Sequence, residues 1–74
     1  MTNETTNLEL LAKNIKKYRK EKNLSQNELA ERLNISREHL AKLETTKRCI
    51  SLKLLFKLSD TLNVSLRDLF TFDD

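Results

Sequence analysis

The chain has 74 residues, of which 38% are hydrophobic and 34% are charged, and its formal net charge is +3. This length allows one domain with one core, and the complete lack of glycine and proline favours helices, because both residues mark turns. No apolar run approaches the ~18 residues of a membrane span, and the N-terminus lacks the basic start of a signal peptide. Cys49 is the single cysteine and cannot form an internal disulfide, which fits a reducing compartment. We therefore expect a cytoplasmic protein that avoids membranes.

Five helices are predicted in chain order. In the first, from about Leu8 to Lys22, apolar residues recur at helical spacing, and Thr6 with Glu9 is typical of a capping box. Each of the other four follows a serine suited to the N-cap position: 26–33 after Ser25, 37–44 after Ser36, 52–62 after Ser51 and 66–70 after Ser65. We therefore predict an all-α, compact five-helix bundle, with residues 1–6 as a flexible N-terminus, 7–72 as a single domain and 73–74 as its C-terminal end.

Asparagine stands where tight connections would normally use glycine. Asn23, Asn34 and Asn63 each follow a predicted helix. Because asparagine tolerates the left-handed conformation that closes helices, we predict this conformation at Asn34 and Asn63, with Asn23 as a further candidate.

The segment QNELAERLNISREHLAKLE, residues 26–44, predicts two short amphipathic helices joined by a tight turn. Leu29, Ala30 and Leu33 mark the apolar face of the first helix, and Leu40 and Leu43 mark that of the second. This is the pattern of a helix-turn-helix, whose second helix can enter a DNA major groove. Basic residues concentrate in 13–22 and 36–48 while both chain ends are acidic, which favours a polyanion-facing surface over a merely solvated one beside such a motif.

Three longer motifs carry a family resemblance: IKKYRKEKNLSQNELAERLNIS, LAKLE and ISLKLLFKLSDTLNVSLRDLF. Over about Leu11 to Phe70 the chain resembles the lambda-repressor-like (Cro/repressor, xenobiotic-response-element) helix-turn-helix family. The resemblance implies a bundle of four or five helices that binds palindromic operators as a dimer. The chain departs from the family pattern at Asn34, Thr46 and Ile50, where glycine, glycine and proline are usual, and the last two changes bear on the path of the Thr45–Ile50 loop.

The resemblance also implies roles for three polar residues. Gln26 matches a glutamine that holds a DNA phosphate together with the N-terminus of its helix, an arrangement that free N–H groups and positive potential favour. Arg19 and Glu44 match a salt bridge between the first helix and the end of the third. The alternatives are a solvent-exposed glutamine and two exposed charges.

The third helix is the candidate reading helix. Leu40 and Leu43 point to the core, so Arg37, Glu38 and Lys42 project outward. Arginine can bind guanine in bidentate fashion and glutamate can accept from the cytosine amino group, whereas in the alternative Arg37 and Glu38 serve phosphates or each other and Lys42 alone reads a base. The residues expected to read bases are Ser36, Arg37, Glu38, His39 and Lys42, and those expected to contact phosphates are Lys17, Ser25, Gln26, Lys47 and Arg48.

Four apolar residues crowd the C-terminus: Leu66, Leu69, Phe70 and Phe72. We expect part of this patch to form the dimer interface, and the alternative is that it packs onto the first and fourth helices. Cys49 beside Lys47 and Arg48 is compatible with a redox role, but a small, partly buried hydrophobic side chain is the favoured interpretation. His39 has no cysteine or histidine partner at metal-binding spacing.

These features predict a sequence-specific double-stranded-DNA-binding transcriptional regulator of the repressor type, associated with a prokaryotic or phage nucleoid. It would bind a palindromic operator as a homodimer, with no metal, cofactor or small-molecule ligand. The chain lacks a set of catalytic residues, which argues against an enzyme. The alternative is an antitoxin-like or other partner-binding module in which DNA binding is secondary.

Overall fold

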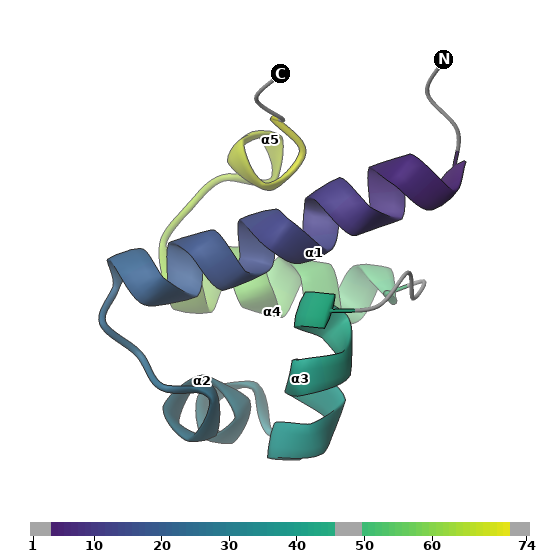
Figure 1. Cartoon of the computed structure of the whole chain (residues 1–74). Helices are drawn as coiled ribbons and strands as arrows, with labels where there is room; N and C mark the ends of the chain where they lie inside the picture. The colour runs from purple at the N-terminus through teal and green to yellow at the C-terminus, as the bar shows by residue number, and fades with distance from the viewer. Residues whose placement is uncertain (1–3, 46–49, 72–74) are drawn as a thin grey trace.

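The computed structural model describes residues 4–45 and 50–71, with side chains from Leu8 onward. These residues form five α-helices: α1 (Glu4–Glu21), α2 (Gln26–Leu33), α3 (Arg37–Thr45), α4 (Leu52–Leu62) and α5 (Leu66–Leu69). In Figure 1, α1 crosses in front of α4, α2 and α3 lie below them, and α5 lies above. The predicted all-α five-helix bundle is confirmed.

The serine caps predicted for α2 to α5 are present. Each serine Oγ accepts a hydrogen bond from the N–H three residues on: Ser25 from Glu28 at 3.0 Å, Ser36 from His39 at 3.0 Å, Ser51 from Leu54 at 3.2 Å and Ser65 from Asp68 at 3.0 Å. The start predicted for α1 is wrong, because the helix begins at Glu4. Thr6 therefore lies inside α1 and is not its N-cap, and residues 4–6 are helical. The sequence signal was misleading because a threonine with a glutamate three residues on also fits a helix interior.

The three asparagines close their helices as predicted. Asn23, Asn34 and Asn63 have φ values of 58°, 62° and 55°, all in the left-handed region. In each case the next residue donates its N–H to the carbonyl five positions back: Leu24 to Arg19 at 3.2 Å, Ile35 to Ala30 at 3.0 Å and Val64 to Ser59 at 3.1 Å. This is the hydrogen bond that satisfies a free carbonyl at a helix C-terminus, so one local solution is used at three helix ends.

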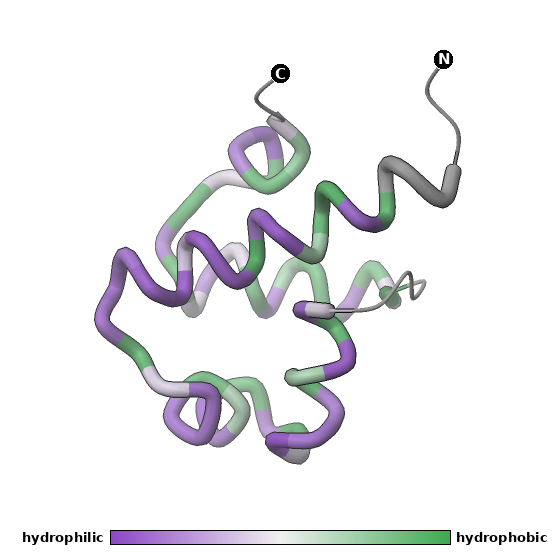
Figure 2. Tube along the Cα trace, viewed as in Figure 1, coloured by the Kyte–Doolittle hydropathy of each residue, from purple (hydrophilic) through white to green (hydrophobic). Residues whose placement is uncertain are grey.

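The core is built almost entirely from leucine, with contributions from every helix (Figure 2). Its fully buried side chains are Ile15, Leu29, Leu33, Leu40, Leu58, Leu62 and Leu69. Ala30, at 2% exposure, is also part of this cluster on α2, and a side chain this small lets α2 and α3 approach closely. The positions of α2 and α3 are thus set by the same core that holds α1 and α4.

Two polar side chains that sequence reasoning missed fasten the ends of this bundle. Asn14, which is buried on α1, donates from Nδ2 to the carbonyls of Leu69 at 2.9 Å and Thr71 at 3.0 Å, and so holds the short α5 against α1. Lys57 on α4 donates from Nζ to the Leu33 carbonyl at 3.1 Å, at the C-terminus of α2. A cation at this helix end complements the carbonyl dipoles and ties the helix-turn-helix to α4.

Candidate nucleic-acid interface

The outer face of α3 carries the side chains expected to read bases. Leu40 and Leu43 are buried, which turns Arg37, Glu38 and Lys42 outward onto one exposed arc. Arg37 Nη2 and Glu38 Oε2 are 3.8 Å apart, beyond hydrogen-bonding distance, and both side chains are largely exposed. An exposed pair of this kind contributes about 0–1 kcal/mol, so it does not hold either side chain away from a ligand.

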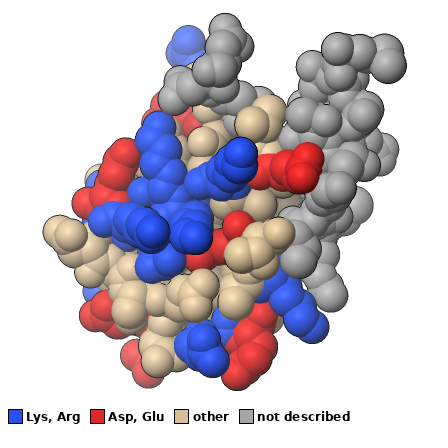
Figure 3. All heavy atoms as spheres, viewed as in Figure 1, with Lys and Arg blue, Asp and Glu red and all other residues tan. Residues whose placement is uncertain are grey.

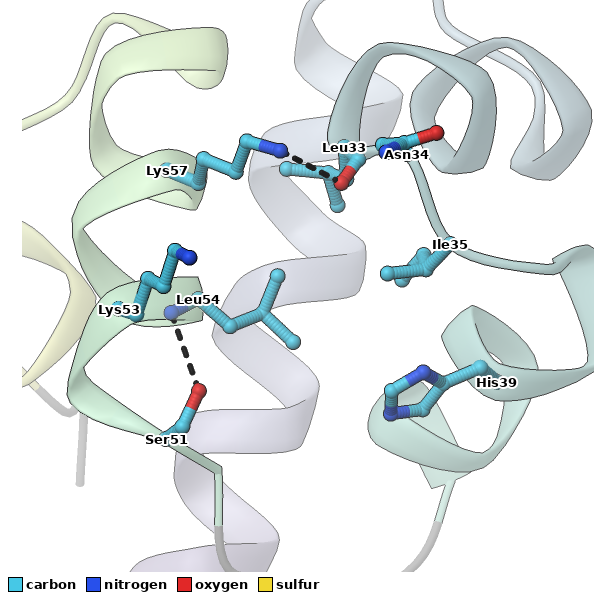
Figure 4. A pocket seen from close by; sticks show the side chains of 8 residues that line it. All are labelled: Leu33, Asn34, Ile35, His39, Ser51, Lys53, Leu54 and Lys57. Atoms are coloured by element: carbon cyan, nitrogen blue, oxygen red, sulfur yellow. Dashed lines mark hydrogen bonds between the residues drawn. The ribbon is translucent and has the colours of Figure 1, made fainter.

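Ser36 and His39 have different surroundings from these three residues. The Ser36 hydroxyl caps α3, so its oxygen already accepts the His39 N–H at 3.0 Å. His39 is exposed at the edge of the outward arc, and its ring points toward the start of α4 (Figure 4). The geometry therefore separates the outward arc of Arg37, Glu38 and Lys42 from these two residues.

The N-terminus of α2 is closed by a reciprocal capping box. Ser25 Oγ accepts from the Glu28 N–H at 3.0 Å, and Glu28 Oε1 accepts from the Ser25 N–H at 2.8 Å. The pKa of the Glu28 carboxyl lies below its ordinary value of 4.5. The main cause is the hydrogen bond that this carboxyl accepts from the Ser25 N–H, and the second is a hydrogen bond between the carboxyl and the Ser25 side chain. The N–H groups of Gln26 and Asn27 have no carbonyl within the helix that they can reach, so they are the groups that α2 offers to an anion. The ionised Glu28 beside them opposes anion binding.

A buried ion pair ties α1 to the end of α3. Arg19 donates from Nε to Glu44 Oε2 at 2.6 Å and from Nη2 to Glu44 Oε1 at 3.2 Å, as the family resemblance implies. Arg19 also donates from Nη1 to the Leu24 carbonyl at 2.7 Å. Both charged residues are buried, at 8% exposure for Arg19 and 4% for Glu44. The end of α3 is consequently fixed to α1 and to the segment before α2.

Gln26 joins the same carboxylate, which sequence reasoning missed. Its Nε2 donates to Glu44 Oε1 at 3.1 Å, linking the start of α2 to the end of α3. The amide group has two donor hydrogens, so one remains for a phosphate while the other holds Glu44. The phosphate contact expected of Gln26 is therefore compatible with this geometry through its second hydrogen.

Of the other residues expected to contact phosphates, the structure describes Lys17 but not Lys47 and Arg48. Lys17 is exposed, and its Nζ lies 5.2 Å from the centroid of the Tyr18 ring, within cation–π range. Figure 3 shows Lys and Arg side chains gathered over α1 in the middle of the view, whereas α3 begins at the bottom of the molecule in Figure 1. Lys47, Arg48 and Cys49 lie outside the described residues.

The expected dimer surface needs a correction. Leu69 is fully buried in the core of its own chain, so its assignment to an interface is wrong: the hydrogen bonds from Asn14 draw the end of α5 onto α1. Leu66 is partly buried against the core, Phe70 is 49% exposed, and Phe72 lies outside the described residues.

Two exposed apolar side chains on α4 were missed. Leu52 is 70% exposed and Phe56 is 54% exposed, and their spacing of four residues places them on one face of the helix. The signal was present in the sequence, because LKLLFKL has more apolar residues than one buried face of a helix can hold.

Neither a metal site nor a membrane-spanning helix is found among the described residues. Within residues 4–45 and 50–71, no group of three or more His, Cys, Asp or Glu side chains is arranged to hold a metal ion. None of the described helices is both long and apolar enough to cross a membrane.

Comparison with known proteins gives a consistent result. The chain is 40% identical over 60 residues to an uncharacterised HTH-type transcriptional regulator of Archaeoglobus fulgidus, covering 81% of this chain and 84% of the relative. It is 38% identical over 63 residues to the control protein C.SmaI of Serratia marcescens, covering 85% and 75%. These relatives are named as regulators or control proteins and not as enzymes.

Solved structures agree with the sequence relatives. The restriction-modification controller protein C.AhdI of Aeromonas hydrophila superposes with a TM-score of 0.79 at 30% identity, covering 85% of this chain and 96% of that one. The biofilm master regulator SinR, solved in complex with DNA, superposes with a TM-score of 0.76 at 35% identity, covering 82% and 98%. A helix-turn-helix family model matches residues 15–69, which is most of the chain. The protein therefore belongs to this helix-turn-helix family.

Proposed function

We propose that this protein is a sequence-specific regulator of transcription that binds a palindromic operator as a homodimer, with α3 of each copy in the major groove. The observation that carries the proposal is the arc of Arg37, Glu38 and Lys42 on α3. The helix is fixed on its buried side by the leucine core and at its C-terminal end by the buried Glu44 carboxylate. A reading helix needs both features, since base discrimination requires polar groups held in a defined orientation.

The chemistry of the arc matches base edges. The Arg37 guanidinium can donate two parallel hydrogen bonds to O6 and N7 of guanine, and Glu38 can accept from the amino group of cytosine. These two pairings favour a G·C pair in each half-site. Lys42 lies one helical turn beyond Glu38, which is within reach of a neighbouring base pair in the same groove.

Contacts to the backbone would set the register of α3. The first N–H groups of α2 and the second hydrogen of the Gln26 amide would bind a phosphate, and Gln26 would connect that contact to α3 through Glu44. The basic residues of α1 and the 47–48 pair add sequence-independent attraction. SinR, which has this fold, was solved in complex with DNA, and this supports DNA as the ligand.

The dimer would use exposed apolar side chains. Leu52 and Phe56 on α4 and Phe70 after α5 are the large hydrophobic side chains that the described structure leaves exposed. Covering them with the same surface of a second copy would remove them from water and present two reading helices to successive major grooves, about 34 Å apart. Such a dimer would repress transcription by occupying its operator, in the compartment that holds the genome.

The exposed apolar face of α4 equally suits a different protein, which is the antitoxin-like alternative. Light scattering of the isolated chain distinguishes the two proposals. A dimer at micromolar concentration that becomes a monomer in the Phe56→Asp variant supports the regulator. A monomer that dimerises only with a second gene product supports the partner-binding module.

DNA binding is tested by fluorescence anisotropy with a selected operator and with variants of that operator. Arg37→Ala and Lys42→Ala should each cost ~1–3 kcal/mol on the operator and relax preference at defined base pairs. Gln26→Ala should weaken operator and random DNA alike. Lys13→Ala, which removes one exposed charge from α1, is the matched control and should leave base preference intact.

Salt dependence provides a second readout of the same complex. If the dimer makes ~6–10 phosphate contacts, affinity should fall ~10³–10⁵-fold between 50 and 200 mM salt. An affinity that hardly changes over this range, or an Arg37→Ala variant with unaltered base preference, would contradict the proposal.

A further inference from the structure

A hollow of about 260 Å³ separates the helix-turn-helix from the start of α4 (Figure 4). The end of α2, the turn and α3 form one wall, and the first turns of α4 form the other. Its lining residues are Leu33, Asn34, Ile35, His39, Ser51, Lys53, Leu54 and Lys57. The DNA-reading arc and the exposed apolar side chains do not account for this space.

The lining combines an apolar floor with a cationic rim. Leu33, Ile35 and Leu54 supply the apolar surface. Lys53 and Lys57 border the hollow on the α4 side, and the His39 ring points into the hollow from α3 (Figure 4). None of the eight lining residues is acidic, and Lys57 offsets the carbonyl dipoles at the C-terminus of α2, which would otherwise repel an anion.

Lys57 makes this rim partly preorganised. Its Nζ is held by the Leu33 carbonyl at 3.1 Å, directly beside the apolar floor. An ammonium group carries three donor hydrogens, so two remain for an acceptor at the mouth of the hollow. Lys53, one helical turn earlier on the same face of α4, adds a second ammonium group.

We propose that this hollow is a binding site for a small aromatic monocarboxylate. Its volume exceeds the ~150 Å³ of an apolar cavity that binds benzene, so a single ring with one acidic group can enter it. The ring would lie against Leu33, Ile35 and Leu54, with its carboxylate toward Lys53 and Lys57. A phosphate ion fits less well, because it would leave the apolar floor in water while using the same ammonium groups.

Binding to a wall that carries α3 would place the ligand next to the reading helix. Any change in DNA affinity on binding must then be matched by an equal change in ligand affinity when DNA is bound. The site itself does not depend on the proposed regulator function, since it is defined without DNA.

The experiment is a titration of the ¹⁵N-labelled full chain, without DNA, followed by backbone amide shifts. Benzoate should give saturable shifts confined to residues lining the hollow, with a dissociation constant of about 1 mM or tighter. Benzamide, the neutral analogue of equal shape, and inorganic phosphate should each bind at least about threefold more weakly.

Single lysine variants test whether the ammonium groups beside the hollow bind the carboxylate of benzoate. Lys53→Gln should weaken benzoate about threefold, whereas Lys13→Gln, which removes one exposed charge from α1, should not. If Lys53→Gln does not fold, Lys53→Ala replaces it with the same expected direction. Equal binding of benzamide or phosphate, shifts spread over α1, or unchanged affinity in the folded variant would overturn the proposal.

Discussion

The buried Arg19–Glu44 pair offers the sharpest test of how the reading helix is held. Replacing Arg19 with methionine keeps much of the aliphatic volume but removes the guanidinium. It deletes both hydrogen bonds to Glu44, at 2.6 and 3.2 Å, and the bond to the Leu24 carbonyl at 2.7 Å. Glu44, whose side chain has no exposed surface, is then left as a buried carboxyl group with Gln26 as its remaining side-chain donor.

The expected cost follows from that uncompensated charge. Removing one partner of a buried ion pair destabilises a protein by about 3–5 kcal/mol. A domain of this length has a total free energy of unfolding of about 4–11 kcal/mol, at about 0.05–0.15 kcal/mol per residue. Arg19→Met should therefore remove about a quarter of the stability or more. The Arg19→Met/Glu44→Leu double variant should be much closer to the wild type, because an apolar pair of similar volume carries no buried charge.

Urea denaturation followed by circular dichroism measures both effects. With a slope of ~1 kcal/mol per M for a small domain, Arg19→Met should lower the midpoint by about 3 M or leave the chain unfolded in water. A coupling free energy of at least about 2 kcal/mol should emerge from the double-mutant cycle. Single variants that each cost under about 1 kcal/mol, or costs that add in the double variant, would refute the claim that this pair fixes α3.

Three further predictions concern local features. The folded-state pKa of Glu28 is lowered below 4.5, so the stabilising contribution of its carboxylate is present above that pH and is lost as the pH falls through the folded-state value. Glu28→Gln should therefore lose less stability in acid than the wild type, as measured by urea titration at pH 3 and 6. Asn34→Ala should cost about 1 kcal/mol because of the left-handed backbone, whereas Asn34→Gly should fall within about 0.5 kcal/mol of the wild type in the same assay. Asn14→Leu should leave the Leu69 and Thr71 carbonyls without their donor, cost about 1–3 kcal/mol, and increase amide hydrogen exchange in α5 but not in α2.

The helices and their ends were largely predictable because the signals are local. A serine before an apolar run and an asparagine after it act through backbone groups within five residues, so no tertiary information is needed to interpret them. The buried faces of α2 and α3 follow from leucine spacing for the same reason. The start of α1 was predicted wrongly because its local signal is ambiguous. Thr6 and Glu9 satisfy the capping pattern, but the same pair also fits inside a helix, and α1 begins at Glu4.

The features that were missed depend on long-range packing. Asn14 meets Leu69 across 55 residues and Lys57 meets Leu33 across 24, and nothing in the spacing of those residues indicates either contact. Leu69 was assigned to a dimer interface because so short a predicted helix cannot bury all of its apolar side chains alone. The structure buries it against the other helices. The Arg19–Glu44 pair was expected from the family resemblance alone, and Gln26 as its third member became visible only in the structure.

The central claim is that two copies of α3 read a symmetric operator, and selection of bound duplexes from a random DNA library tests it most directly. The account predicts a palindromic consensus with a G·C pair in each half-site and half-site centres about 10 base pairs apart, one helical turn. It also predicts that repeating the selection with Arg37→Ala loses preference at corresponding positions in both halves. Recovery of no consensus, or of a single half-site without a symmetric partner, would contradict it.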